Sequence, residues 1–190
     1  MTIENVGALV DDRPSDGWFS VDRAAFTDEA LFEREIRHIF EGGWVFLGMD
    51  SQAAEKHSYF TVTIGHTPIV VMRDGEGTLG AFVNACPHKG ALICHRRTGK
   101  GRLHVCRYHS WSFDSAGRNV AVKGMNAGAY SEEFIGRDRN LPRLPAFANY
   151  RGFLFGSLVP TCPIEEHLGE ARRLLDLSAD QGEGGLELVP

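Results

Sequence analysis

The chain has 190 residues, of which 43% are hydrophobic and 24% charged, as expected for a folded protein of about one domain. Its formal net charge of −5 argues against a nucleic-acid-binding surface or a polybasic membrane patch. No apolar run approaches the roughly 20 residues that span a bilayer, and residues 1–6 lack the features of a secretory signal. We therefore expect a cytoplasmic protein without membrane or nucleic-acid partners, and its four cysteines are too few for a disulfide scaffold.

The first part of the sequence predicts a polar arm followed by a helix. Residues 1–26 are polar and irregular, and we expect an exposed arm there. A helix is predicted from Asp28 to Glu41, with Thr27 as its N-cap and Gly42-Gly43 at its end. Its apolar residues fall on one broad face, so it should pack against the rest of the protein. Residues 1–43 are accordingly predicted to form an N-terminal arm and helix.

Short strands separated by turn residues dominate from Trp44 onwards. Apolar runs predict the strands, and Asp74-Gly-Glu-Gly77 predicts a hairpin turn between two of them. No helix-length pattern separates the strands, which argues against a doubly wound α/β fold and indicates a mainly β protein of antiparallel sheets. The predicted strands cover residues 59–64, 68–73, 79–84, 103–106, 111–114, 119–122 and 152–158.

Helical periodicity returns near the end of the chain. One helix is predicted from Thr161 to Leu177, with Pro163 near its start and acidic residues in its first turn. After Asp180 the sequence is rich in glycine and indicates a flexible exit. These patterns divide the chain into the arm and helix, a β domain at 44–160, and a C-terminal helix and linker at 161–190.

Two short segments carry the chemistry, Cys86-Pro-His88 and Cys106-Arg-Tyr-His109. Each follows a predicted strand and offers one thiolate and one imidazole. A mixed-ligand [2Fe–2S] cluster takes two cysteines on one iron and two histidines on the other, which is this set. Each loop would give its Cys to one iron and its His to the other, and Gly90 would let the backbone pass close to the cluster. Cys86, His88, Cys106 and His109 are therefore the predicted metal and cofactor ligands.

The same residue types also occur in other kinds of site. Zinc is the alternative metal, although zinc modules more often pair Cys with Cys and His with His at short spacings. Cys94-His95 allows other cysteine pairings, but we expect Cys94 to be a buried structural residue, and Cys162 to be unreactive packing. His104 and His109 are spaced as in some mononuclear iron sites, but no carboxylate stands at the expected place before them.

The paired motif is that of the Rieske proteins, and the chain resembles the large subunits of bacterial aromatic-ring-hydroxylating dioxygenases. The resemblance covers nearly the whole chain and implies a Rieske-type antiparallel β fold with an N-terminal helix and a short C-terminal helix. It is carried by Phe32-x3-Ile36-x3-Phe40-x3-Trp44, Val83-Asn-Ala-Cys-Pro-His88, Cys106-Arg-Tyr-His-Ser-Trp111 and Gly152-Phe-Leu-Phe155.

In that family a second domain holds a mononuclear Fe(II) with two His and one carboxylate. After His109 this sequence contains only His167, so we expect no catalytic iron site in the chain and a catalytic domain beyond Pro190. The resemblance implies an electron relay that takes single electrons from a reductase or ferredoxin and passes them to the catalytic domain of a neighbouring subunit. It further implies an oligomer, with or without a small β subunit. A stand-alone Rieske ferredoxin is the alternative, although such carriers usually lack the arm and the tail.

The same resemblance implies finer properties. High-potential Rieske proteins have a disulfide and a serine hydroxyl beside the cluster, and both are absent here. We therefore expect a potential low in the Rieske range of about −150 to +300 mV. His109 is the predicted exit ligand for the electron, with Tyr108 and Trp111 beside it shaping a docking surface. The likeness leans towards enzymes that act on benzoate-like aromatic carboxylates.

Overall fold

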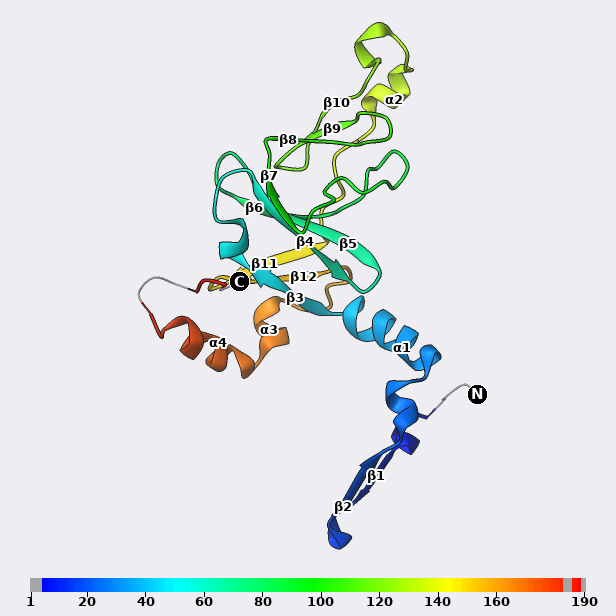
Figure 1. Cartoon of the computed structure of the whole chain (residues 1–190), viewed down its shortest axis with the longest axis vertical. Helices are drawn as coiled ribbons and strands as arrows, with labels where there is room; N and C mark the ends of the chain where they lie inside the picture. Colours follow the sequence, from blue (N-terminus) through cyan, green and yellow to red (C-terminus); the bar gives the residue numbers. More distant parts are fainter. Residues whose placement is uncertain (1–4, 183–185, 189–190) are drawn as a thin grey trace.

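The fold is mainly β, which confirms the prediction. The computed structural model describes residues 5–182 and 186–188, and in these ranges the strands form four antiparallel sheets. An N-terminal hairpin projects from one end, three sheets make up the body, and a short helix marks the opposite tip (Figure 1). None of the helices in these ranges has the length and apolar content needed to cross a bilayer.

The central sheet has the strand order β6-β5-β4-β7 and is covered on both faces. Ile69, Val70, Val71 and Met72 of β5 have no exposed surface, and successive side chains of a strand point to opposite faces. Val70 and Met72 pack into one apolar core, whereas Ile69 and Val71 pack into another. The central strands are β4 (Ser58–Ile64), β5 (Thr67–Arg73), β6 (Leu79–Val83) and β7 (Thr98–Lys100).

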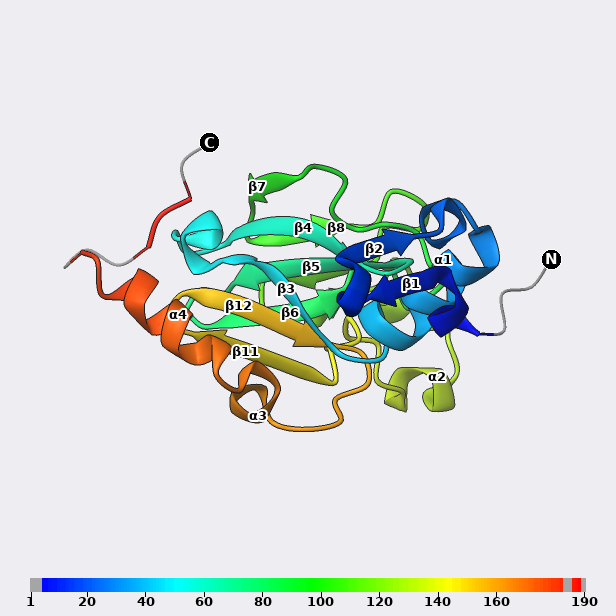
Figure 2. The same cartoon turned by 90° about the horizontal axis from the view of Figure 1, so that it is seen from below.

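The second sheet, β11-β12-β3, covers one face of the central sheet (Figure 2). Leu47 of β3 and Leu154 of β12 are buried in the core that also holds Ile69 and Val71. This sheet joins distant parts of the chain. Of its three strands, β12 was predicted from the sequence, whereas β3 and β11 were not. The bounds are β3 (Trp44–Met49), β11 (Ala146–Tyr150) and β12 (Phe153–Ser157).

The third sheet, β10-β9-β8, lies on the other side of the central sheet. Phe113 of β9 and Phe82 of β6 are fully buried in the core between the two sheets. The chain then runs through helix α2 (Glu132–Gly136), whose N-cap Ser131 accepts a hydrogen bond from the backbone N–H of Phe134. The strands are β8 (Leu103–Val105), β9 (Ser112–Asp114) and β10 (Asn119–Ala121).

The N-terminal arm is more ordered than predicted. Instead of an irregular segment, β1 (Val10–Arg13) and β2 (Trp18–Val21) form a hairpin. Helix α1 (Glu29–Glu35) follows and continues as a π-helical turn at Ile36–Phe40. Its N-cap is Asp28, whose carboxylate accepts the N–H of Leu31 at 2.8 Å. The prediction of Thr27 was wrong, because its hydroxyl donates to the carbonyl of Arg23 instead.

The C-terminal region contains two short helices rather than the single predicted one. Helix α3 (Ile164–Leu168) ends at Gly169, whose φ of 48° and ψ of −127° break the helical path, and α4 (Ala171–Ala179) follows. Asp176 of α4 accepts hydrogen bonds from Tyr150 and Arg151, which attach this helix to the turn between β11 and β12. The predicted flexible exit after Asp180 lies partly outside the described residues. Short 3₁₀ turns occur at Val6–Leu9, Pro14–Asp16, Arg23–Phe26, Asp50–Ala53 and Met125–Ala127.

Candidate metal centre

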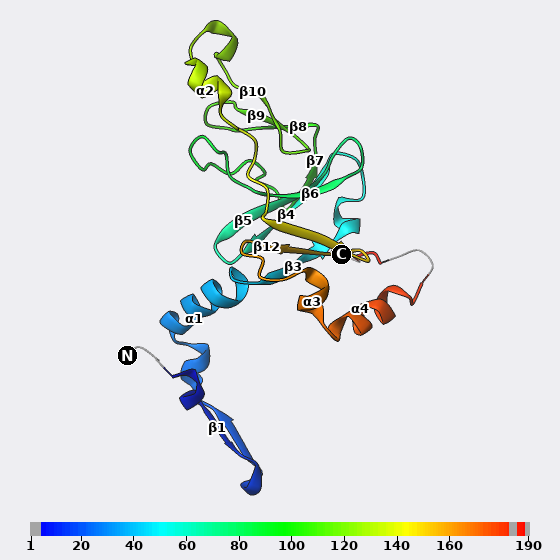
Figure 3. The same ribbon diagram turned by 180° about the vertical axis from the view of Figure 1, so that it is seen from behind.

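Two loops bring the predicted ligands together. The first follows β6 and the second follows β8, and the views from front and back both show them side by side (Figures 1 and 3). The imidazole rings of His88 and His109 have their centroids 4.6 Å apart, almost perpendicular to each other at 78°. Cys86 and Cys106 belong to one buried cluster, and each is only 2% exposed. The structure therefore places one buried thiol pair and one exposed imidazole pair at the same site.

The two loops have the same backbone design. In the first, the N–H of Cys86 donates to the carbonyl of Ala91, and Gly90 donates back to the carbonyl of Cys86. In the second, the N–H of Cys106 donates to the carbonyl of Trp111, and Ser110 donates back to the carbonyl of Cys106. These matching bonds fold each loop tightly around its cysteine.

A left-handed residue closes each of the two loops. Gly90 has a φ of 72° and Ser110, at the equivalent position, has a φ of 59°. A Cβ added to Gly90 would meet no described atom within 4 Å. Within the described chain, glycine is therefore favoured at position 90 by the left-handed backbone conformation and not by lack of space for a side chain. The sequence motif alone did not reveal that Ser110 has the same task.

The surroundings of the Cys86 thiol disfavour its ionisation. Burial raises the pKa of the Cys86 thiol, the backbone N–H of His88 partly opposes this, and the neighbouring Cys106 thiol adds to the rise. The thiolate is the form that binds metal, so metal binding at this pair would release protons. This donor set fits a cluster whose irons supply the missing charge.

The two histidines differ in how firmly they are held. The ring of His88 stacks on Trp111 with centroids 4.9 Å apart and only 10° between the planes. His109 meets the edges of its neighbours His88 and Tyr108 instead. Partial burial lowers the pKa of His88, and so do the nearby His109 and Lys89, which favours the neutral imidazole that ligates metals.

Trp111 does not form part of an exposed docking surface, contrary to the prediction. Its side chain is 4% exposed, whereas Tyr108 is 71% exposed. Trp111 is instead the first ring of an aromatic series. Its ring centroid lies 5.9 Å from that of Phe134 of α2, with the two rings nearly perpendicular, and Tyr130 stacks on Phe134 with centroids 4.4 Å apart. The series connects the second ligand loop to α2, and through Trp111 it also contacts His88 of the first loop.

Asn84 is a structural residue of the site that sequence reasoning missed. It is 3% exposed and lies at the end of β6, two residues before Cys86. Its Nδ2 donates to the carbonyl of Cys94 at 2.8 Å, and its Oδ1 accepts the backbone N–H groups of Cys94 at 2.9 Å and Ile93 at 3.3 Å. These bonds tie both ends of the first ligand loop together. The only signal in the sequence was a single polar residue at the end of the predicted strand 79–84, two residues before Cys86.

Cys94 and Cys162 lie in other surroundings. The Cys94 sulfur is 3.5 Å from Nδ1 of the buried His104, and burial raises the pKa of this thiol to about 12. Burial also lowers the pKa of His104, so a protonated thiol faces a neutral imidazole. Cys162 precedes α3, where its carbonyl accepts the indole N–H of Trp44 at 2.9 Å.

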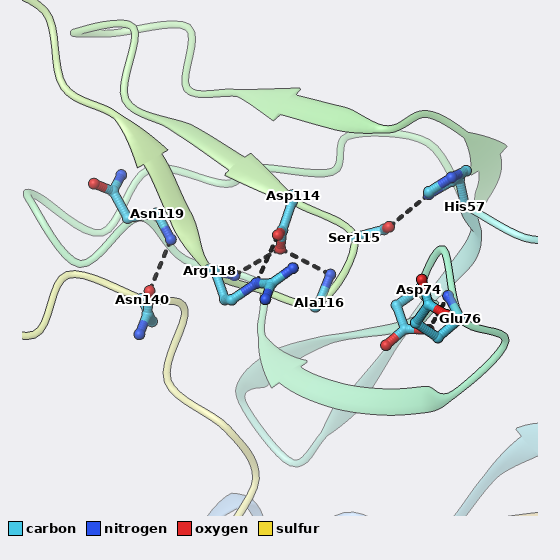
Figure 4. Close-up of polar contacts among 9 residues, drawn as sticks. All are labelled: His57, Asp74, Glu76, Asp114, Ser115, Ala116, Arg118, Asn119 and Asn140. Carbon is cyan, nitrogen blue, oxygen red and sulfur yellow. Dashed lines mark hydrogen bonds and ion pairs between the residues drawn. The ribbon is translucent and has the colours of Figure 1, made fainter.

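Polar contacts fasten the third sheet to the central one (Figure 4). His57 precedes β4, and its Nδ1 lies 2.7 Å from the hydroxyl of the buried Ser115 in the β9–β10 turn. In the same turn Asp114 accepts the backbone N–H groups of Ala116 and Arg118. A cavity of about 150 Å³ lies between these groups and the turn at Asp74–Glu76. The sheet that carries the second ligand loop is thereby anchored.

The four predicted ligands are not arranged around a single point. Within the residues that the structure describes, no group of three or more His, Cys, Asp or Glu side chains converges on one metal position. A Rieske cluster does not require such a group, since each of its irons takes only two protein ligands.

Comparisons with known proteins bear on the same region. Residues 43–147 match the model of the Rieske [2Fe-2S] domain. The α subunit of toluate 1,2-dioxygenase from Pseudomonas putida is 40% identical over 189 residues, or 98% of this chain and 42% of that protein. The large subunit of 2-halobenzoate 1,2-dioxygenase from Burkholderia cepacia is 43% identical over 186 residues, or 97% of this chain and 40% of that protein.

Among solved structures, naphthalene 1,2-dioxygenase from Rhodococcus sp., bound to indole, is similar with a TM-score of 0.80 and 31% sequence identity. The similarity covers 93% of this chain and 40% of that one. The chain thus spans about two fifths of the length of the relatives it matches.

Proposed function

The chain belongs to the Rieske [2Fe–2S] domain family, and on this premise we propose that it is the electron-relay part of an aromatic-ring-hydroxylating dioxygenase large subunit. The observation that carries the proposal is the pair of matching loops, which place two buried thiols beside two exposed imidazoles. The similarity to the toluate dioxygenase subunit covers 98% of the chain, including the arm and the C-terminal helices. This extent favours an oxygenase subunit over a stand-alone Rieske ferredoxin.

Cys86 and Cys106 are proposed to hold one iron, and His88 and His109 the other. When bound, the cluster accepts and releases one electron at a time. The burial of the cysteines directs the imidazole pair towards solvent, where a partner has access. Residues 44–160 are proposed as the Rieske domain, between the arm and helix at 1–43 and the helices and linker at 161–190.

His109 is proposed as the ligand through which the electron leaves. His88 is covered on one face by Trp111, at a centroid distance of 4.9 Å. The neighbour of His109 in the same loop is the highly exposed Tyr108, so a partner that touches Tyr108 comes close to His109. The partner expected there is the catalytic domain of a neighbouring subunit.

The substrate and the other components are proposed from the relatives. The names of two relatives specify toluate and 2-halobenzoate, which supports an aromatic carboxylate as the substrate of the whole enzyme. A reductase or ferredoxin would supply the electrons, and the enzyme would be a cytoplasmic oligomer, with or without a small β subunit. The mononuclear iron that activates O₂ is proposed to belong to the catalytic domain and not to this chain.

Ligand replacement tests the proposal. We expect the purified chain to contain two irons and two sulfides and to give a rhombic Rieske-type electron paramagnetic signal when reduced. Cys86→Ala, His88→Ala, Cys106→Ala and His109→Ala should each abolish the signal, whereas Cys94→Ala and Cys162→Ala should keep it. Loss of the signal in Cys94→Ala, or a colourless chain that binds one zinc, would contradict the ligand assignment.

A further inference from the structure

The segment of the chain that contains both ligand loops has an excess of positive charge. Between Glu76 and Asp114 the chain contains six Lys or Arg residues and no Asp or Glu, although its formal net charge is −5. The six residues are Lys89, Arg96, Arg97, Lys100, Arg102 and Arg107.

Three of these cations line one open groove of about 270 Å³. Arg96, Lys100 and Arg107 contribute to its wall together with His95, and no carboxylate does. Lys100 forms an ion pair with Glu55. Within the described part of the chain, no carboxylate pairs with Arg96 or Arg107, and both side chains are exposed. Their charges are therefore available to a partner.

The same groove also has an exposed apolar part. Leu103 and Val105 of β8 line it, and they are 59% and 49% exposed. They are two residues apart on β8 and so point to the same face of its sheet. The centres of protein–protein interfaces are more apolar than the rest of the surface and are enriched in arginine, and the exposed apolar side chains distinguish the groove from a face that is only charged.

The groove reaches one of the proposed cluster ligands along the chain. Val105 and Arg107 both line it, and Cys106 lies between them. A donor seated in the groove would therefore contact the two residues that are bonded directly to Cys106. A negatively charged partner would be steered there, and such steering raises association rates by about 10- to 1,000-fold at low salt.

We infer that this groove is the docking surface for the electron-donor protein, and that the donor presents an acidic patch to it. The inference rests on the proposed function, because a donor has a role only if the chain holds a reducible cluster. Arg96 and Arg107 provide the charge complementarity, while Leu103 and Val105 provide apolar contact once the donor has docked.

The test follows reduction of the loaded chain by a plant-type [2Fe–2S] ferredoxin, an acidic one-electron carrier, in stopped-flow experiments at 20 and 500 mM salt. We expect the second-order rate constant of the wild type to fall at least tenfold at high salt. Arg96→Glu combined with Arg107→Glu should lower it at least tenfold at low salt and remove most of the salt dependence. Arg23→Glu combined with Arg37→Glu, an equal change of charge on the arm, should alter it less than twofold.

The electron paramagnetic signal of the chain after dithionite reduction distinguishes a failure of the proposed function from a failure of the docking inference alone. If it is absent from the wild type, both the proposed function and this inference are overturned. If it is present but the ferredoxin rate does not depend on salt, or the arm variant is slowed as much as the groove variant, the docking inference alone is overturned. Concentration-dependent dimers that disappear in the groove variant would assign the groove to a second copy of the chain and also overturn it.

Discussion

Replacing Asn84 should release the first ligand loop without touching a ligand. Asn84→Ala removes all three hydrogen bonds of the side chain, at 2.8, 2.9 and 3.3 Å. It leaves two backbone N–H groups and one carbonyl buried without a partner. Each such orphan costs about 1–3 kcal/mol, and a water molecule entering the vacated space would recover part of this. The three orphans together cost about 3–9 kcal/mol, and because water recovers part of this we expect a loss of about 3 kcal/mol in the free energy of unfolding, the lower end of that range.

Asn84→Asp separates the two kinds of hydrogen bond. The carboxylate keeps the oxygen that accepts from Cys94 and Ile93, but it cannot donate to the Cys94 carbonyl. Burial raises the pKa of such a carboxyl. Its stabilising protonated form is therefore present at low pH and is lost as the pH rises through the folded-state pKa. The deficit of Asn84→Asp relative to the wild type should accordingly shrink as the pH is lowered from 7.5 to 5.5.

The assay is urea unfolding of the loaded chain, followed by circular dichroism, together with iron and sulfide analysis. Asn140→Ala is the matched control, since this exposed asparagine accepts a single hydrogen bond from the N–H of Asn119, and about 1 kcal/mol or less should be lost there. The reasoning is refuted if Asn84→Ala loses less than 1 kcal/mol and retains full iron content.

Two further predictions concern the loops and the buried thiol. Gly90→Ala should destabilise the chain by about 1 kcal/mol, because an alanine is strained in the left-handed backbone conformation of this residue. Ser110→Gly should leave the free energy of unfolding unchanged or raise it in the same urea assay. A loss of stability in both variants would contradict the equivalence of the two loops. Cys94, with a folded-state pKa of about 12, should resist iodoacetamide at pH 8 until the chain unfolds. Since this pKa is raised, the stabilisation from the protonated thiol is complete below the unfolded-state pKa of about 8.5 and is lost as the pH rises towards 12. The wild type should therefore lose more stability than Cys94→Ala between pH 9 and 11, and parallel profiles would count against a buried thiol.

Local patterns in the sequence predicted the candidate ligands and much of the secondary structure. The spacing of Cys86, His88, Cys106 and His109 specified two loops with one thiol and one imidazole each, because ligand type and loop length are both local properties. The hairpin turn from Asp74 to Gly77 was likewise confirmed, since the Asp74 carboxylate accepts the N–H groups of Glu76 and Thr78.

Errors arose where two alternatives were locally similar. Thr27 and Asp28 are both good N-caps, and only the path of the preceding turn gives the role to Asp28. The single predicted C-terminal helix ignored Gly169, whose backbone angles interrupt it. The arm was considered irregular because residues 1–26 are largely polar, yet two strands in it pair in register from Val10↔Val21 to Arg13↔Trp18.

The tertiary structure alone decided which distant residues support the site. Asn84 acts across ten residues on Cys94, and Trp111 of the second loop stacks on His88 of the first. Neither interaction leaves a periodic trace in the sequence, because it depends on how the strands bring the two loops together. The sequence by itself determined which atoms are available to bind a cluster. Their mutual placement, with thiols buried and imidazoles exposed, was determined by the packing of the third sheet against the central one.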